Sequence, residues 1–241
     1  MRYLIFGTLV CMLFTACEQH PKINYKDNTD TTSVIDNRMK DTTKVLVAEL
    51  PVKFDSTDVL IFAIGLVDLQ ARGGYSRFES SSSGDSDIAS SYFNKDILTG
   101  SLINLVFRDK NGDERKLTDR KIVIRRVTFL REIFYKTKTG YLLYSIIDRD
   151  TNGDKILNNS DLETLYISRN DGTGFKKISK ELHEFYDFSI ITGENRVYFR
   201  TLEDHNKDGL LNNQDKFHYY TIDFTPDAYK VNEYNPLKTI E

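Results

Sequence analysis

The sequence predicts an all-β protein made of repeated four-stranded antiparallel meanders, and three observations support this. Apolar residues gather in runs of five to nine, and "GYLLYSII" at 140–147 is apolar on both of its alternating faces. Such runs are typical of strands buried from both sides. A shift of 54 residues superimposes one part of the chain on another, placing Tyr144 on Tyr198 and Tyr166 on Tyr220. Turn-forming stretches such as "RNDGTG" separate the runs, as expected between neighbouring strands.

The repeat defines two regular units, at about 120–180 and 181–235. In the first unit we expect strands at "RKIVIRRVTF", "GYLLYSII", "ETLYIS" and "FKKIS". In the second unit the corresponding runs are "EFYDFSII", "NRVYFRTLE", "FHYYTIDF" and "YKVNEY". Each unit is therefore predicted to fold as one four-stranded meander.

A less regular unit precedes these two, at about 44–119. Its expected strands are "KVLVAELPVKF", "DVLIFAIGL", "LINLVFRD" and "ERKL", with "KNGD" as the hairpin turn between the last two. An insert at 68–100 contains the serine run "SSSSGDSD". Long loops of this kind are either disordered or functional, so we expect a mobile segment or a binding loop there. Residues 44–241 are predicted to form one β-repeat domain.

The stretch "TLYISRNDGTGFKKIS" at 164–179 resembles the strand–turn–strand of Tol-type periplasmic β-propellers, in which an "LYI" strand leads into a DG turn. The resemblance covers 120–235 best and implies units similar to propeller blades. Three units are fewer than the four or more blades of a closed propeller. We therefore expect an open stack or a small propeller, with a β-sandwich as the alternative.

Two loops between expected strands have the spacing of a calcium site. In the first, Asp150, Asn152 and Asp154 alternate, and Asp161 follows eleven residues after Asp150. Calcium takes six to eight oxygen ligands in a flexible shell. Ordinary polar turns do not require the same spacing twice, so we predict two calcium sites. The expected ligands are Asp150, Asn152, Asp154, the carbonyl of Ile156, Asn158 and Asp161, and in the second loop Asp204, Asn206, Asp208, the carbonyl of Leu210, Asn212 and Asp215.

These loops resemble the calcium loops of dockerins and other EF-hand-like repeats, with two departures. The sixth position, where the sharp turn favours glycine, is Gly209 in the second loop but Lys155 in the first. A left-handed backbone there would cost about 1–2 kcal/mol at Lys155. Moreover, β-rich sequence follows each loop, where dockerins have a helix. A third stretch, at 109–119, has a similar acidic start but no closing carboxylate, and is predicted to be a hairpin turn.

The N-terminus has the pattern of an export signal followed by a lipid anchor. Arg2 precedes an apolar run of about 14 residues that ends in "LFTAC". The run is too short to span a bilayer and is typical of a secretory signal. "LFTAC" resembles a bacterial lipobox, so we predict a signal peptide at 1–16 and a lipidated Cys17. Polar residues follow, and 17–43 are predicted to form a flexible tether with a typical end-to-end distance of about 30 Å.

Composition limits the function further. The chain has 33 basic and 36 acidic residues, and loss of the signal removes one basic residue, Arg2. No basic face for nucleic acid is therefore expected. Both cysteines, Cys11 and Cys17, lie at the N-terminus, so the mature chain can form no disulfide. Calcium would then be what secures the loops.

No catalytic motif stands out in the sequence. His183, His205 and His218 are not paired with an evident nucleophile, and phosphate-binding glycine patterns are absent. The leading expectation is a non-enzymatic, calcium-stabilised lipoprotein of the outer membrane, facing the periplasm or the cell surface. It would act as a binding or scaffold module for an envelope protein or polymer. The alternatives are a polymer-degrading hydrolase and a dockerin-like module that binds a cohesin-like partner.

Overall fold

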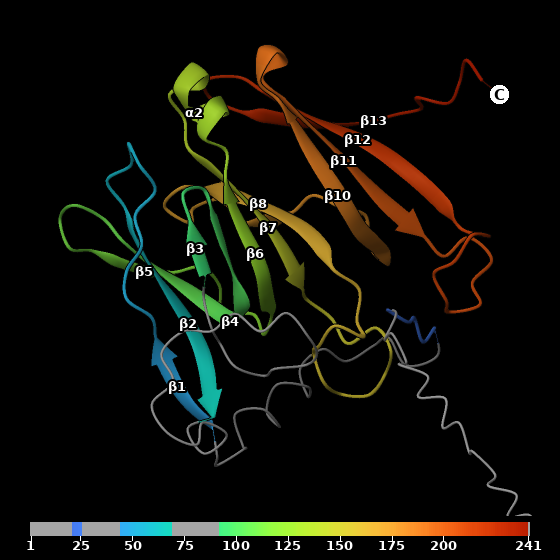
Figure 1. The fold of residues 1–241 in the computed structure, drawn as a ribbon, viewed down its shortest axis with the longest axis horizontal. Helices are drawn as coiled ribbons and strands as arrows, with labels where there is room; N and C mark the ends of the chain where they lie inside the picture. Colours follow the sequence, from blue (N-terminus) through green and yellow to red (C-terminus); the bar gives the residue numbers. More distant parts are fainter. Residues whose placement is uncertain (1–20, 26–43, 69–91, 241) are drawn as a thin grey trace, which may run out of the picture.

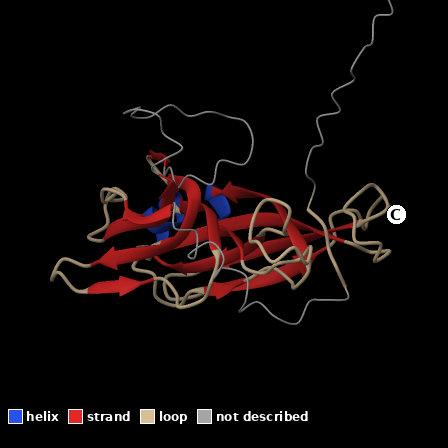
Figure 2. Ribbon diagram, turned by 90° about the horizontal axis from the view of Figure 1, so that it is seen from below, coloured by secondary structure: helices blue, strands red, loops and turns tan. Residues whose placement is uncertain are grey.

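A computed structural model describes residues 21–25, 44–68 and 92–240. Antiparallel strands are the main secondary structure in this part of the chain, as Figure 2 shows. The all-β fold of antiparallel meanders is therefore confirmed. The predicted signal peptide, Cys17 and most of the insert at 68–100 lie outside the described residues. None of the helices in the described ranges is long and apolar enough to cross a membrane.

Within the described residues, the larger of two sheets has nine strands and runs in the order β1-β2-β4-β6-β7-β8-β9. The twelve residues of β4 also pair with β3 near their start and with β5 near their end. Because β4 pairs with β6, the units predicted at 44–119 and 120–180 belong to one continuous sheet. The strands are β1 (Lys44–Ala48), β2 (Leu60–Asp68), β3 (Tyr92–Asn94), β4 (Ile97–Arg108), β5 (Glu114–Lys116), β6 (Val123–Phe129), β7 (Tyr141–Ile147), β8 (Thr164–Arg169) and β9 (Lys176–Lys177).

The unit predicted at 181–235 forms the second sheet, a four-stranded meander in the order β10-β11-β12-β13. It packs beside the larger sheet at β7 and β8, as Figure 1 shows. Its elements are β10 (His183–Ile191), the 3-10 turn η1 (Thr192–Glu194), β11 (Arg196–Glu203), β12 (Lys216–Phe224) and β13 (Tyr229–Tyr234).

Strand β7 lies between two hydrophobic cores. Leu142, Tyr144 and Ile146 face a core enclosed by the larger sheet. Tyr141 and Leu143 face the other core, which fills the space between the two sheets. All seven residues of β7 are buried, and this position explains why its sequence is apolar on both faces.

The larger sheet curls so that distant strands meet at the turn between β8 and β9. Phe107, on β4, packs against Gly172 so closely that a Cβ atom there would lie 2.6 Å from the phenyl ring. Gly172 also has a φ of +80°, which side chains other than glycine rarely adopt. The turn predicted from "RNDGTG" therefore requires glycine for two separate reasons, and it closes the core on the concave side of the sheet.

One helix was not predicted. Helix α2 (Arg131–Thr137) connects β6 to β7 and ends at Lys138, whose backbone is left-handed. Ile133 is fully buried in the core between the sheets, and Arg131 is buried and donates to Asp96 at 2.7 Å. With seven residues, the helix is too short to show a helical period in the sequence.

Candidate metal centres

The two predicted calcium loops lie at the same end of the sheets. Residues 150–161 join β7 to β8, and residues 204–215 join β11 to β12. A short N-terminal segment, residues 21–25, lies between them and contacts both, as seen at the lower right of Figure 1. The prediction that both loops connect consecutive strands of a sheet is therefore confirmed, and strands β8 and β12 follow the two loops.

In the first loop the acidic side chains fold back onto backbone N–H groups. Asp150 accepts from the N–H of Gly153 and of Lys155, both at 2.7 Å. Asp154 accepts from the N–H of Ile156 at 2.7 Å. Asp161 is fully buried and accepts from the N–H of Thr151, Asn152 and Asn158 at 2.7, 3.3 and 3.0 Å. Burial raises the pKa of Asp161 to about 6, although these backbone donors oppose the change.

The second loop repeats this pattern. Asp204 accepts from the N–H of Gly209 at 2.8 Å, Asp208 from that of Leu210 at 2.8 Å, and Asp215 from those of His205 and Asn212 at 3.0 and 2.7 Å. Asn206 and Asn212 accept from the N–H two residues further on, as Asn152 and Asn158 do in the first loop. The 54-residue repeat therefore extends to individual hydrogen bonds.

Asp204 provides a direct test of whether a cation fits the second loop. The residue is only 3% exposed. Its Oδ2 accepts hydrogen bonds from Gly209 and Tyr25, whereas its Oδ1 is buried and has no hydrogen-bond partner among the described residues. A buried carboxylate oxygen without a partner is costly, and a calcium ion would satisfy it. Asp204 occupies the first ligand position of the predicted site, so the second loop fits calcium on this observation.

Among the described residues, the group of three His, Cys, Asp or Glu side chains whose ligand atoms lie close enough together to hold a metal lies outside both loops. Ile156 and Leu210, predicted to offer carbonyl oxygens, have half-exposed side chains and donate their N–H to the central aspartate of their loop.

The third acidic stretch, at 109–119, is a hairpin turn, as predicted. Asp109 accepts hydrogen bonds there from the N–H groups of Asn111 and Asp113.

Each loop has two residues with left-handed backbone, at positions four and six, and one of the two is glycine. In the first loop the glycine is at position four, and position six is a lysine. Gly153 and Lys155 have φ of +83° and +67°, and the equivalent Lys207 and Gly209 have φ of +59° and +84°. The glycine in each loop is the residue that the N-terminal segment approaches. A Cβ atom on Gly209 would lie 2.5 Å from the carbonyl oxygen of Ile23, and one on Gly153 would lie 2.8 Å from Asn24 Nδ2.

The N-terminal segment 21–25 alternates its hydrogen bonds between the two loops. Backbone N–H groups of Lys22 and Asn24 donate to the carbonyls of Ser160 and Thr151 in the first loop, at 3.1 and 2.6 Å. Between them, the N–H of Ile23 donates to Gly209 in the second loop at 2.9 Å. Tyr25 completes the pattern, because its hydroxyl donates to Asp204 Oδ2 at 2.9 Å.

This docking corrects the prediction that all of 17–43 is a free tether. Ile23 is buried, with 5% of its surface exposed, in a stretch that composition alone marks as polar. One apolar residue among polar neighbours has no detectable period, so the sequence carried no sign that this stretch would pack against loops more than a hundred residues away.

Sequence reasoning also missed a group of three potential ligands beside the second loop. His183, Glu203 and His218 have ligand atoms within 4.8 Å of one another. They come from three neighbouring strands, where His183 pairs with Glu203 and His218 pairs with Thr201. Burial, together with the nearby His218, lowers the pKa of His183 to about 4. Only the strand register brings these residues together, and it was not specified closely enough by the sequence.

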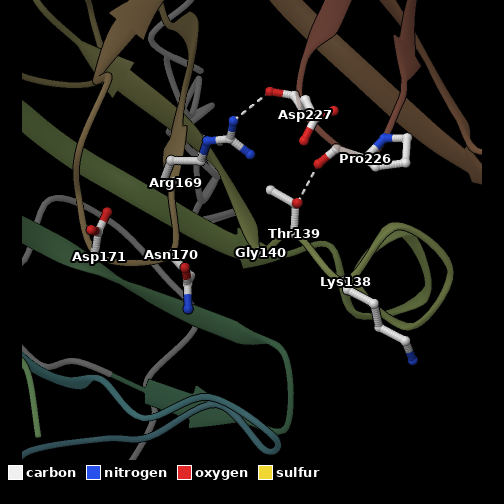
Figure 3. A pocket seen from close by; sticks show the side chains of 8 residues that line it. All are labelled: Lys138, Thr139, Gly140, Arg169, Asn170, Asp171, Pro226 and Asp227. Atoms are coloured by element: carbon white, nitrogen blue, oxygen red, sulfur yellow. Dashed lines mark hydrogen bonds between the residues drawn. The ribbon is translucent and has the colours of Figure 1, made fainter.

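A shallow cleft of about 380 Å³ lies at the opposite end of the sheets, near α2. Figure 3 shows Arg169 reaching across it to the carbonyl of Asp227, at 2.7 Å, and Thr139 donating to the carbonyl of Pro226. These two bonds join the larger sheet to the smaller one, so Arg169 and Thr139 help to hold the sheets together. The cleft is lined by Lys138, Thr139, Gly140, Arg169, Asn170, Asp171, Pro226 and Asp227.

Comparison of the chain with protein-family models, with curated proteins and with solved structures finds no match.

Proposed function

We propose that this chain is a calcium-stabilised lipoprotein of the bacterial cell envelope, anchored to the outer membrane through Cys17, whose β domain is a binding or scaffold module for an envelope protein or polymer. The observation that carries the calcium assignment is the buried, unpartnered Oδ1 of Asp204 at the first ligand position of the second loop. The matching hydrogen bonds of the first loop support a second, equivalent site.

The N-terminal segment gives the calcium loops a role beyond local stability. Burial of Ile23 contributes about 1.5–3 kcal/mol, and the four hydrogen bonds to the loops contribute about 0.5–1.5 kcal/mol each. Ordering five residues costs about 1–2 kcal/mol per residue in backbone entropy. The favourable and unfavourable contributions are of similar size, so docking of this segment is close to balance.

A calcium ion in either loop would favour the docked state. The segment donates hydrogen bonds to Ser160, Thr151, Gly209 and Asp204, which all belong to the two loops. A bound ion restricts the loop backbone and so lowers the entropy that is lost when the segment docks. Calcium binding and segment docking are therefore expected to strengthen each other.

Docking also changes the distance between the domain and its anchor. Pro21 lies four positions after Cys17, and at about 3.3–3.6 Å per residue this stretch spans at most about 14 Å. A tether that is free over its whole length has a typical reach of about 30 Å. We infer that calcium holds the loop end of the domain close to the membrane, and that loss of calcium releases it.

A hydrolase is the second candidate, because His183, Glu203 and His218 gather outside the loops. The cleft near α2 is at the other end of the sheets and shares none of these residues. The dockerin-like alternative required helices after Asp161 and Asp215, but β8 and β12 follow these residues. The non-enzymatic binding module is therefore the function that we propose.

Limited digestion with trypsin tests the calcium-dependent docking. The bond after Lys22 is a tryptic site, and the N–H of Ile23 on its far side is held by Gly209. We expect cleavage there to be slower in millimolar calcium than in chelator, with magnesium giving little protection because of its strict octahedral geometry. Asp208→Ala should reduce the protection. Equal cleavage rates in calcium and chelator would refute the coupling.

The anchor is tested separately in cells. Cys17→Ser should release the protein from the membrane fraction or block its maturation. Unchanged membrane association with a normally processed N-terminus would contradict the lipid anchor, without affecting the calcium sites.

A further inference from the structure

We propose that His183, Glu203 and His218 form a binding site for a divalent transition metal, with zinc as the ion that suits them best. Their ligand atoms lie within 4.8 Å of one another. Two imidazoles and one carboxylate are a donor set for zinc and other first-row transition metals, whereas calcium and magnesium prefer oxygen ligands alone. This site is thus chemically distinct from the two oxygen-rich loops.

The strands hold the three side chains on one face of the smaller sheet. His183 on β10 is directly opposite Glu203 on β11, and His218 on β12 is opposite Thr201, two residues before Glu203. Residues two apart on a strand point to the same side. The face is the inner one, because Phe199, two residues before Thr201, lies in the core between the sheets. The ligands therefore converge at the end of that core.

Each histidine is oriented by a partner on its Nδ1. His183 Nδ1 lies 3.0 Å from Thr201 Oγ1, and His218 Nδ1 lies 2.8 Å from Glu233 Oε1. Histidines that bind metals usually make such a bond through the nitrogen that does not bind the ion, and it fixes the ring and its tautomer. In both residues this arrangement leaves Nε2 for the metal, and His218 Nε2 already lies 2.8 Å from Glu203 Oε2.

The surroundings position the outer carboxylate and leave one side of the group open. Lys180 Nζ lies 2.9 Å from Glu233, so Glu233 is held in place toward His218. His183 and the side chain of His218 are 7% and 13% exposed, whereas the side chain of Glu203 is 37% exposed. The group therefore offers three protein ligands and is open to solvent on the side of Glu203. Zinc sites of this kind keep a fourth coordination position for water or another ligand.

A structural ion pair is the competing explanation. A protonated His218 between Glu203 and Glu233 would satisfy both carboxylates without a metal. Zinc would displace the proton from Nε2 and leave the bond between Nδ1 and Glu233 in place, so binding should release protons. The role of His183 separates the two explanations, because its ring is 4.8 Å from that of His218 and it has no place in the ion pair.

The test uses the mature chain and measures zinc binding by titration calorimetry, with cobalt(II) absorption as a second readout. We expect one zinc ion per chain and visible cobalt bands typical of a site with nitrogen ligands. His218→Gln and Glu203→Gln should abolish both. Glu233→Gln should weaken zinc binding by about 10–100-fold, the usual effect of removing an outer carboxylate. His183→Gln should also abolish binding, provided that its circular dichroism shows an intact fold.

Two controls make the outcome decisive. His205→Gln removes an exposed histidine outside the group and should leave zinc affinity unchanged. Asp208→Ala impairs the proposed calcium loop and should also leave it unchanged, so a failure of the calcium proposal would not affect this result. The absence of saturable one-to-one binding, or equal zinc affinity in the parent and in a folded His183→Gln variant, would overturn the proposal.

Discussion

Gly209→Ala is the substitution for which the structure makes the most specific prediction. Gly209 has a φ of +84°, and the alanine Cβ would lie 2.5 Å from the carbonyl oxygen of Ile23. The left-handed backbone costs about 1–2 kcal/mol for an alanine. The clash involves a backbone atom, so it can be relieved only if the N-terminal segment moves away. Because docking of that segment is nearly balanced, its loss should add little to the change in stability.

We therefore expect Gly209→Ala to lower the free energy of unfolding by about 1–2 kcal/mol and to expose the bond after Lys22 to trypsin. Urea denaturation measures the first effect, and mass spectrometry of the digest measures the second. Lys207→Ala is the matched control, because that position in the same loop is also left-handed at φ +59° and is already occupied by a residue with a side chain. A Gly209→Ala variant that protects Lys22 as well as the parent does would refute the described contact between Gly209 and Ile23.

Three further substitutions test individual parts of the structure. Lys155→Gly should raise the free energy of unfolding by about 0.5–1 kcal/mol in urea denaturation, because it relieves a left-handed lysine but adds freedom to the unfolded chain. Gly172→Ala should cost about 2–4 kcal/mol in the same assay, from backbone strain and overpacking against Phe107; Gly174→Ala, with φ +67° and open space around it, should cost only about 1–2 kcal/mol. Asp204→Asn should keep the acceptor for Gly209 but lose most of the calcium-dependent rise in melting temperature, since a neutral amide is a weaker calcium ligand. Equal losses for the two glycine variants, no gain for Lys155→Gly, or a full calcium response in Asp204→Asn would each contradict the corresponding argument.

Features that depend on local sequence were predictable. The apolar character of "GYLLYSII" identified β7 as a strand buried on both faces, and the structure places it between two cores. The repeat of 54 residues located both loops between consecutive strands, and the same Asx hydrogen bonds recur in each. A conformational cost was expected at Lys155 if its backbone were left-handed, and its φ is +67°. All of these follow from residues that are close together in the chain.

Features that depend on distant contacts were not predictable. Pairing of β4 with β6 joins two units into one sheet, and the pattern of apolar residues within each unit does not specify which unit lies beside it. The N-terminal segment finds its partners some 130 and 185 residues away, through backbone hydrogen bonds that leave no trace in side-chain composition. His183, Glu203 and His218 converge only because the strand register aligns them, and a shift of one residue would turn a ligand to the other face.

Thermal melting in calcium and in chelator shows whether the two loops bind calcium in the folded protein. A ligand that binds only the folded state stabilises it by about 2.7 kcal/mol per site at a hundredfold excess over Kd. Calcium modules of exported proteins often bind weakly, so about 1 kcal/mol per site is expected in about 1 mM calcium. We predict that the parent melts at a clearly higher temperature in calcium than in chelator, and that the double variant Asp154→Ala, Asp208→Ala shows no such difference. If the parent melts at the same temperature in both buffers, the loops are ordinary polar turns and the account is contradicted.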